Sequence, residues 1–295
     1  MARVLGVGIA TLDLIFEVDH HPAADEEMRA LAFHRRRGGN ATNTLVVLSG
    51  LGHRCSWAGL LPSDEAADFV ADDLARHGIS LHAVERTEEG ALPISCVLLD
   101  RRSGARTIVH HRDLPEYSAD AFARLTPSHY DWIHFEGRAV EELARMLPKA
   151  AARVPCSLEI EKPRSGIEAL FRHPRLLLFS RGYARARGFD DGAAFLAEAA
   201  PSGKTCYLAW GSGGGWCREA DGRIHFQPAP KVEVVDSLGA GDVFNAAVVH
   251  GTLQGWTAPR VLAFAVRLAS AKCARMGLEG LERRSERFFD AEGAI

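Results

Sequence analysis

Motifs of closely spaced cysteines and long apolar runs are missing from this 295-residue sequence, and we expect no cleavable leader. Its six cysteines include no C-x-x-C pair and lie mostly in apolar stretches, so we expect reduced, buried thiols and neither a disulfide framework nor a zinc site. No run of about 18 apolar residues occurs, and no membrane span is expected. The first eight residues read as a short strand without a signal-peptide cleavage region, which predicts a cytoplasmic protein.

Two nucleotide-binding signatures are also absent. Gly203-Lys204-Thr205 ends like a P-loop, but Glu198 stands where that pattern requires its first glycine, and a strand follows instead of a helix. Gly6-Val7-Gly8 begins like a dinucleotide fingerprint, but Thr11 replaces the third glycine. Any nucleotide must therefore be held in another way. The net charge of −3 provides no general basic surface, so no nucleic-acid partner is expected.

From about residue 115 onward, strand-like and helix-like segments alternate regularly. This alternation predicts an α/β fold in which a largely parallel central sheet carries helices on both faces. The expected strands of this half cover residues 132–135, 157–160, 176–179 and 205–210, and the expected helices cover 139–147 and 193–200. In the first half we expect strands at 4–9 and 55–60 and helices at 40–51 and 64–77, the latter capped by Ser63.

Two further pairs of strand-like segments do not fit the alternation. They cover residues 12–18 with 28–35 and residues 93–99 with 105–111, and the polar turn at 100–104 makes the second pair a hairpin candidate. We expect these segments to form a small extra sheet that acts as a lid over a cleft at the carboxyl ends of the main strands.

The segment over residues 234–247 is the most informative about chemistry. An apolar stretch enters the small-residue turn Gly239-Ala240-Gly241, and Asp242 then opens an amphipathic helical stretch. Unpaired N–H groups at a helix N-terminus bind phosphate oxygens, and glycines let the backbone approach the anion. Asp242 is then placed to accept a proton, which predicts phosphoryl transfer to a hydroxyl group. The alternative is an aspartate cap on a glycine-rich turn that binds no ligand.

Residues 38–43 form a second segment that is rich in candidate binding residues. Gly39 precedes Asn40 and Asn43, which lie three residues apart on one face of a helical turn. Amide side chains donate and accept hydrogen bonds, which suits sugar hydroxyls, although Asn40 as a plain helix cap is the alternative. Asp13, between two leucines, needs a partner or a ligand such as a sugar diol. The neighbouring run at 35–37, three arginines, is either a solvated face or an anion site.

Together these two segments resemble the two signatures of the ribokinase-like (PfkB) carbohydrate kinases, and within that family the ketohexokinases. The resemblance extends over nearly the whole chain. It is also carried by residues 12–13, 37–43, 104–108, 132–138, 159–164 and 209–211. It implies a single ribokinase-like domain over residues 1–295, a three-layer α/β/α fold with a mostly parallel central sheet and a small β-sheet lid from about 11–36 and 93–112.

The resemblance also implies roles for individual residues. Asp242 is the implied base, and Gly239, Ala240 and Gly241 supply N–H groups around the transferred phosphoryl group. The implied sugar-binding residues are Asp13, Gly39, Asn40, Asn43, Glu136 and, from the partner subunit of a homodimer joined through the lid sheets, Asp25. The implied nucleotide-binding residues are Arg106, Lys162, Gly211, Ser212, Gly213, Gly214, Gly239 and Gly241.

The implied cofactors are ATP and Mg²⁺, with K⁺ as a candidate because a monovalent cation site near Asp236 and residues 273–277 is common in the family. Many members carry an N-x-x-E motif tied to Mg²⁺, but this chain reads Glu159-Ile160-Glu161-Lys162 there. We expect phosphorylation of a ketohexose such as fructose at the 1-hydroxyl. The alternatives are another acceptor (2-keto-3-deoxygluconate, ribose, a nucleoside or an anionic ketohexose) and a sugar- or nucleotide-sensing protein without activity.

Overall fold

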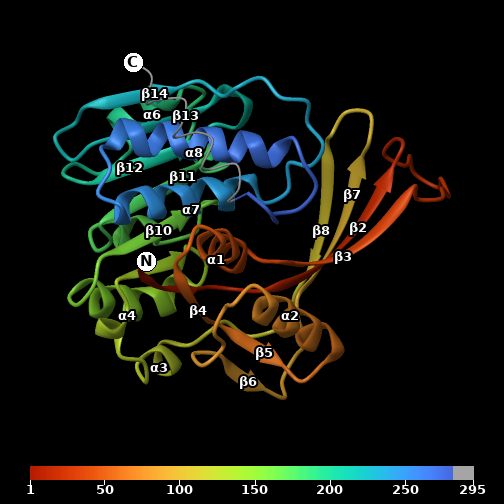
Figure 1. Cartoon of the computed structure of the whole chain (residues 1–295), viewed down its shortest axis with the longest axis horizontal. Coiled ribbons are helices and arrows are strands. Elements are labelled where there is room, and N and C mark those ends of the chain that lie inside the picture. Colours follow the sequence, from red (N-terminus) through yellow and green to blue (C-terminus); the bar gives the residue numbers. More distant parts are fainter. Residues whose placement is uncertain (282–295) are drawn as a thin grey trace.

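An eight-stranded sheet forms the centre of the computed structural model, which describes residues 1–281 (Figure 1). The strand order is β14-β13-β12-β11-β10-β9-β1-β4. The strands from β12 to β4 are parallel, and β13 and β14 add an antiparallel edge. The bounds are β1 (Arg3–Val7), β4 (Arg54–Ala58), β9 (Trp132–Glu136), β10 (Cys156–Ile160), β11 (Leu176–Ser180), β12 (Thr205–Ala209), β13 (Gly215–Arg218) and β14 (Ile224–Gln227).

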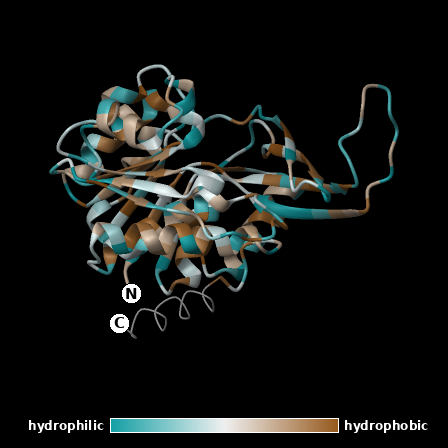
Figure 2. Cartoon of the chain, turned by 90° about the horizontal axis from the view of Figure 1, so that it is seen from above, coloured by the Kyte–Doolittle hydropathy of each residue, from teal (hydrophilic) through white to brown (hydrophobic). Residues whose placement is uncertain are grey.

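Helices cover both faces of this sheet, as Figure 2 shows. On β11, Leu176 and Leu178 contribute to one apolar core and Leu177 and Phe179 to the other, because successive side chains of a strand point to opposite faces. The first core includes α1 (Asn40–Gly50), α2 (Glu65–Arg76), α7 (Ala240–Leu253) and α8 (Ala258–Cys273). The second includes α3 (Ala119–Phe122), α4 (Val140–Ala151), α5 (Arg181–Ala186) and α6 (Gly192–Glu198). The expected three-layer fold is confirmed.

A separate four-stranded sheet projects from one end of the main body (Figure 1). Its order is β3-β2-β7-β8, with β7 and β8 forming the expected antiparallel hairpin and β2 parallel to β7. The bounds are β2 (Thr11–Val18), β3 (Ala32–Gly38), β7 (Ile94–Asp100) and β8 (Arg106–His111). The remaining elements are β5 (Leu60–Pro62) with β6 (Glu85–Thr87) and the 3₁₀ turns Pro127–His129, Ile167–Leu170 and Gly211–Gly213.

Several details differ from the sequence predictions. The cap of α2 is Asp64, which accepts a hydrogen bond from Ala67 N at 2.7 Å, whereas Ser63 donates to Glu88 instead. The helix after the glycine turn, α7, is buried from Asp242 to Gly251 between α1 and α8, so it is not amphipathic. The edge hairpin of β13 and β14 and the helix α8 were not predicted.

The cysteines follow the expectation only in part. All six are free, and four are buried, but Cys96 is exposed and Cys273 is half-buried. No helix within residues 1–281 has the length and apolar character required to cross a membrane.

Candidate active site

A cavity of about 450 Å³ lies where the carboxyl ends of the parallel strands face the small sheet. Open α/β sheets commonly bind ligands at this edge. Four strands reach it at their carboxyl ends, the first turns of α1 and α7 border it, and β2, β7 and β8 cover it. The lining includes eleven of the residues predicted from sequence: Asp13, Gly39, Asn40, Asn43, Arg106, Glu136, Lys162, Gly239, Ala240, Gly241 and Asp242.

Asp242 lies in the first turn of α7, with its side chain buried at the edge of the cavity. The turn before it is possible because Gly239 adopts a left-handed conformation (φ 79°) and serves as the N-cap residue. Burial raises the pKa of Asp242 well above its ordinary value, and the nearby charges of Glu161 and Glu136 raise it further. The hydrogen bond from Asn43 works in the opposite direction.

A chain of hydrogen bonds orients Asn43 toward Asp242. The Asn43 Nδ2 donates to Asp242 Oδ2 at 2.7 Å, and its Oδ1 accepts from Arg37 Nη1 at 2.5 Å. The Arg37 Nε in turn donates to Asp73 Oδ2 at 2.8 Å. Because Arg37 can only donate, it determines which end of the Asn43 amide faces the aspartate. Arg37 is buried, so the solvated face expected for the run at 35–37 does not hold for this arginine, and the sequence did not predict its contact with Asn43.

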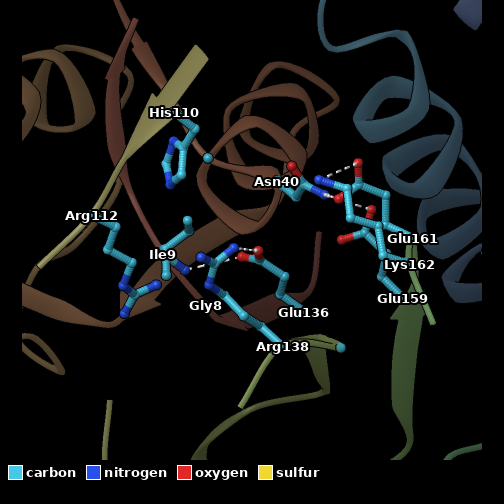
Figure 3. Close-up of polar contacts among 12 residues, drawn as sticks. Gly8, Ile9, Asn40, His110, Arg112, Glu136, Arg138, Glu159, Glu161 and Lys162 are labelled. Atoms are coloured by element: carbon cyan, nitrogen blue, oxygen red, sulfur yellow. Dashed lines mark hydrogen bonds and ion pairs between the residues drawn. The ribbon is translucent and has the colours of Figure 1, made fainter. Parts of the chain in front are cut away.

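The remaining residues predicted to bind sugar lie around the same cavity. Asp13 is buried on β2 and accepts from Thr11 Oγ1 at 2.8 Å, and burial raises its pKa. Glu136, at the end of β9, accepts from Ile9 N at 3.0 Å and lies 3.8 Å from Arg138 (Figure 3).

The amide of Asn40 points toward two carboxylates (Figure 3). Its Nδ2 lies 3.1 Å from Glu159 Oε1 and 3.2 Å from Glu161 Oε2. Glu159 also accepts from Asn245 Nδ2 at 3.1 Å, while its Oε2 is buried without a hydrogen-bond partner. Burial, followed by the charges of Asp242 and Glu136, raises the pKa of Glu159 well above its usual range.

Sequence reasoning assigned no role to Glu159 or Asn245. The signal that singled out Asp13, a carboxylate between two apolar residues, is also present at Glu159, between Leu158 and Ile160. Its unpartnered oxygen and the nearby Glu161 suit a hard cation such as Mg²⁺, which takes one or two protein carboxylates together with phosphate oxygens. In residues 1–281, no three acidic, histidine or cysteine side chains converge on one metal position.

Two of the predicted nucleotide-binding cations reach the cavity. Arg106 extends from β8 and donates to Ser237 Oγ at 2.5 Å, in the loop before α7. Lys162 follows β10, with its Nζ 3.7 Å from Glu161 Oε1.

The glycine-rich turn is placed differently. Gly211, Ser212, Gly213 and Gly214 do not line the cavity, although Ala209 before them does. Gly214 has a positive φ of 100°, and a Cβ there would come within 2.1 Å of Gln227 O, so the close packing of β13 and β14 explains this glycine. A nucleotide role for these four residues remains a prediction.

Asp25 and the arginine run lie elsewhere. Asp25 is exposed in the loop between β2 and β3 and does not line the cavity, so its role in a partner subunit remains a prediction. Arg35, Arg36 and Arg37 line a second cavity of about 430 Å³ behind the small sheet and are paired with Glu65, Asp236 and Asp73.

Comparisons with known proteins identify the family and the fold. The family model described as "pfkB family carbohydrate kinase" matches residues 1–282. Mouse ketohexokinase is 34% identical over 293 residues, covering 95% of this chain and 98% of that protein. Ribokinase from Bacillus subtilis is 24% identical, covering 95% and 96%. The crystal structure of a putative ribokinase from Agrobacterium tumefaciens superposes with a TM-score of 0.86 at 24% identity, covering 98% and 99%.

Proposed function

This chain belongs to the pfkB family of carbohydrate kinases and is a sugar kinase, and we propose that it phosphorylates the 1-hydroxyl of a ketohexose such as fructose with ATP. The observation that carries the proposal is the buried carboxylate of Asp242 in the first turn of α7, hydrogen-bonded to Asn43, in a cavity that Asp13 also lines. The likeness to mouse ketohexokinase across 95% of the chain supports the ketohexose as acceptor.

In the proposed complex the sugar occupies the cavity beneath the small sheet. Asp13, Asn40, Asn43 and Glu136 bind its hydroxyl groups, with Gly39 allowing the backbone to approach. The raised pKa values of Asp13 and Glu136 reflect burial away from water, and hydroxyl donors from a sugar would compensate these carboxylates. The small sheet would act as a lid that excludes water during transfer.

The chemical step begins when Asp242 accepts the proton of the attacking hydroxyl. The new O–P bond forms as the bond between the γ-phosphorus and its bridging oxygen breaks, and ADP leaves with that electron pair. The N–H groups at Gly239, Ala240 and Gly241 face the charge on the transferred group, where fixed donors are most effective. General-base assistance contributes roughly 10²–10⁴-fold.

Arg106 and Lys162 are the proposed contacts for the nucleotide phosphates, because both are cations that reach the cavity. We further propose that Glu159 and Glu161 would hold Mg²⁺, which would neutralise negative charge on the nucleotide phosphates. Gly211, Ser212, Gly213 and Gly214 are proposed to lie along the adenosine end.

A homodimer joined through the small sheets is also proposed, with Asp25 reaching the partner's sugar site. Large apolar side chains exposed on or beside this sheet support it, namely Leu31, Phe33, Ile108 and Val109. Free cysteines support a reducing, cytoplasmic location.

An acceptor panel tests the function. ADP release would be measured with fructose, ribose, adenosine, 2-keto-3-deoxygluconate and fructose 6-phosphate. We expect fructose to have the highest kcat/KM, 1-deoxyfructose to be inert, and phosphorus NMR to place the product phosphate on the first carbon. A higher kcat/KM for another acceptor would contradict the ketohexose assignment, and ATP binding without turnover on any acceptor would favour a sensor.

A further inference from the structure

Lys272 is a lysine with no exposed surface, in the last turn of α8. Lysine is almost never fully buried unless its charge is paired. Here the Nζ lies 2.8 Å from Asp236 Oδ2 and 2.7 Å from the backbone carbonyl oxygen of Asp236. One ammonium group thus bridges the side chain and the main chain of the aspartate near which the family resemblance implied a monovalent cation.

The other contacts of the Asp236 carboxylate oxygens are also with hydrogen-bond donors. Its Oδ1 accepts from Leu238 N at 2.8 Å, and its Oδ2 accepts from Gly277 N at 3.1 Å and from Arg36 Nη1 at 3.3 Å. All three oxygen atoms of Asp236 therefore face N–H groups. A bound K⁺ needs several oxygen atoms directed at it, and it would meet two positive side chains here. Within residues 1–281, the groups around Asp236 do not fit a metal cation.

The same contacts hold the loop that leads into the active site. The N–H groups of Val235 and Asp236 both donate to Cys273 O, at 2.8 and 3.2 Å, so the end of α8 binds the loop through main chain and side chain. Three residues later the loop reaches Gly239, the N-cap residue of α7. Lys272 also lies at the C-terminal end of α8, where the helix dipole favours a positive charge.

We propose that the ammonium group of Lys272 is a built-in replacement for the monovalent cation at Asp236, so that this kinase neither binds nor requires K⁺ there. The lysine holds the loop in the position that sets the N-terminus of α7. This inference rests on membership of the kinase family and does not depend on which sugar is the acceptor.

Wild-type protein provides the first test, without any mutation. The thermal unfolding midpoint and the turnover would be measured in KCl and in choline chloride at equal ionic strength, and a Rb⁺-soaked crystal would be examined by anomalous scattering. We expect the same midpoint and turnover in both salts and no anomalous peak beside Asp236. A saturable rise of midpoint and turnover with K⁺, or a peak at Asp236, would overturn the proposal.

Lys272→Met provides the second test, with Lys149→Met as its control. Lys149 is an exposed lysine in the last turn of α4, so its loss should change neither midpoint nor turnover. In choline chloride we expect Lys272→Met to lose on the order of 10²-fold in turnover through misplacement of the loop, and roughly 5–15 °C in midpoint. K⁺ or NH₄⁺ should restore part of both.

Wild-type turnover and midpoint in the Lys272→Met protein in choline chloride would refute the inference. If this variant does not fold, the salt titration of the wild-type protein and the Rb⁺-soaked crystal still decide whether K⁺ binds at Asp236. If no sugar is phosphorylated, the proposed function fails, but the unfolding midpoint and the Rb⁺ crystal still test the role of Lys272.

Discussion

Asp236 and Asp242 lie six residues apart in one motif, and both are buried, but their surroundings are opposite. Asp236 faces two cationic side chains and two backbone N–H groups. Asp242 receives a hydrogen bond from Asn43, and the carboxylates Glu136 and Glu161 lie near enough to raise its pKa.

The two pKa values shift in opposite directions as a result. Burial alone would raise the pKa of Asp236, but the charge and hydrogen bond of Lys272, together with the backbone N–H groups of Leu238 and Gly277, outweigh burial and lower that pKa. Burial lowers the pKa of Lys272, and the charge of Asp236 opposes that effect. At Asp242 burial and like charges act together, and the pKa rises.

The comparison supports the proposal that Asp242, and not Asp236, performs the chemistry. A buried carboxylate with both oxygens paired to donors has no capacity left for a substrate proton. Asp236 therefore has a structural role, which is to hold the loop before α7 in place. A buried carboxylate beside other acids is costly to ionise and accepts a proton readily, which is the state a general base requires. Evolution tends to retain such a cost only where function needs it.

Replacing Asp242, the proposed base, should produce the largest effect. Asp242→Asn preserves the shape and the contact with Asn43 but cannot accept a proton, so turnover should fall by roughly 10²–10⁴-fold while ATP binding persists. Steady-state kinetics and calorimetric titration with a nonhydrolysable nucleotide measure the two quantities. Turnover near that of wild type would rule out Asp242 as the base.

Removing the paired aspartate should instead affect stability. Asp236→Asn leaves the buried Lys272 without its counter-charge, and the free energy of unfolding should fall by roughly 3–5 kcal/mol at pH 7. Urea denaturation measures this loss. Asp242→Asn, which removes an unpaired buried charge, should be neutral or stabilising in the same experiment. If both variants shifted stability in the same direction, the contrast between the two aspartates would be wrong.

Arg37 orients the Asn43 side chain that hydrogen-bonds Asp242. Replacing Arg37 should therefore lower turnover, but by less than replacing Asp242. Arg37→Met frees the Asn43 amide, and turnover should fall by roughly 10–100-fold through misplacement. Because the charge of Arg37 lowers the pKa of Asp242, the acid limb of the pH–rate profile should also move to higher pH. Arg35→Met, on the same strand but paired with the exposed Glu65, is the control and should change neither quantity.

The smallest effect concerns pH. Because the folded-state pKa of Asp242 is raised, its ionisation costs stability at neutral pH, and this cost disappears as pH falls toward the unfolded value of about 3.9. The stability gain of Asp242→Asn over wild type should therefore shrink between pH 7 and pH 4. For Asp236 the folded pKa is lowered, so its stabilising contribution should persist to pH 4 and be lost only below it. Urea denaturation of both variants at pH 7 and pH 4 measures these contributions. A stability gain of Asp242→Asn that grows toward pH 4, or an Asp236 contribution already lost at pH 4, would contradict the prediction.

Much of the candidate site could be found from local signals. Asp13 is a carboxylate between apolar residues, and Asn40, Asn43 and Asp242 follow glycines at helix starts, so each is unusual within a few residues of sequence. Glu159 carried the same signal, and the structure places it near three other carboxylates, those of Asp242, Glu136 and Glu161. The glycine-rich turn at 211–214 also stands out in the sequence, but there the packing of β13 against β14, and not a ligand, accounts for Gly214.

The sequence alone determined the alternation of strands and helices, the second sheet and the aspartate beside a glycine-rich turn, because these depend on neighbouring residues and on hydrophobic periodicity. Tertiary structure decided which charges are paired. The Lys272 ammonium reaches Asp236 across 36 residues, and Asn43 reaches Asp242 across 199. The state of a buried carboxylate depends on charges within a few ångströms, and folding, not sequence distance, brings those charges together.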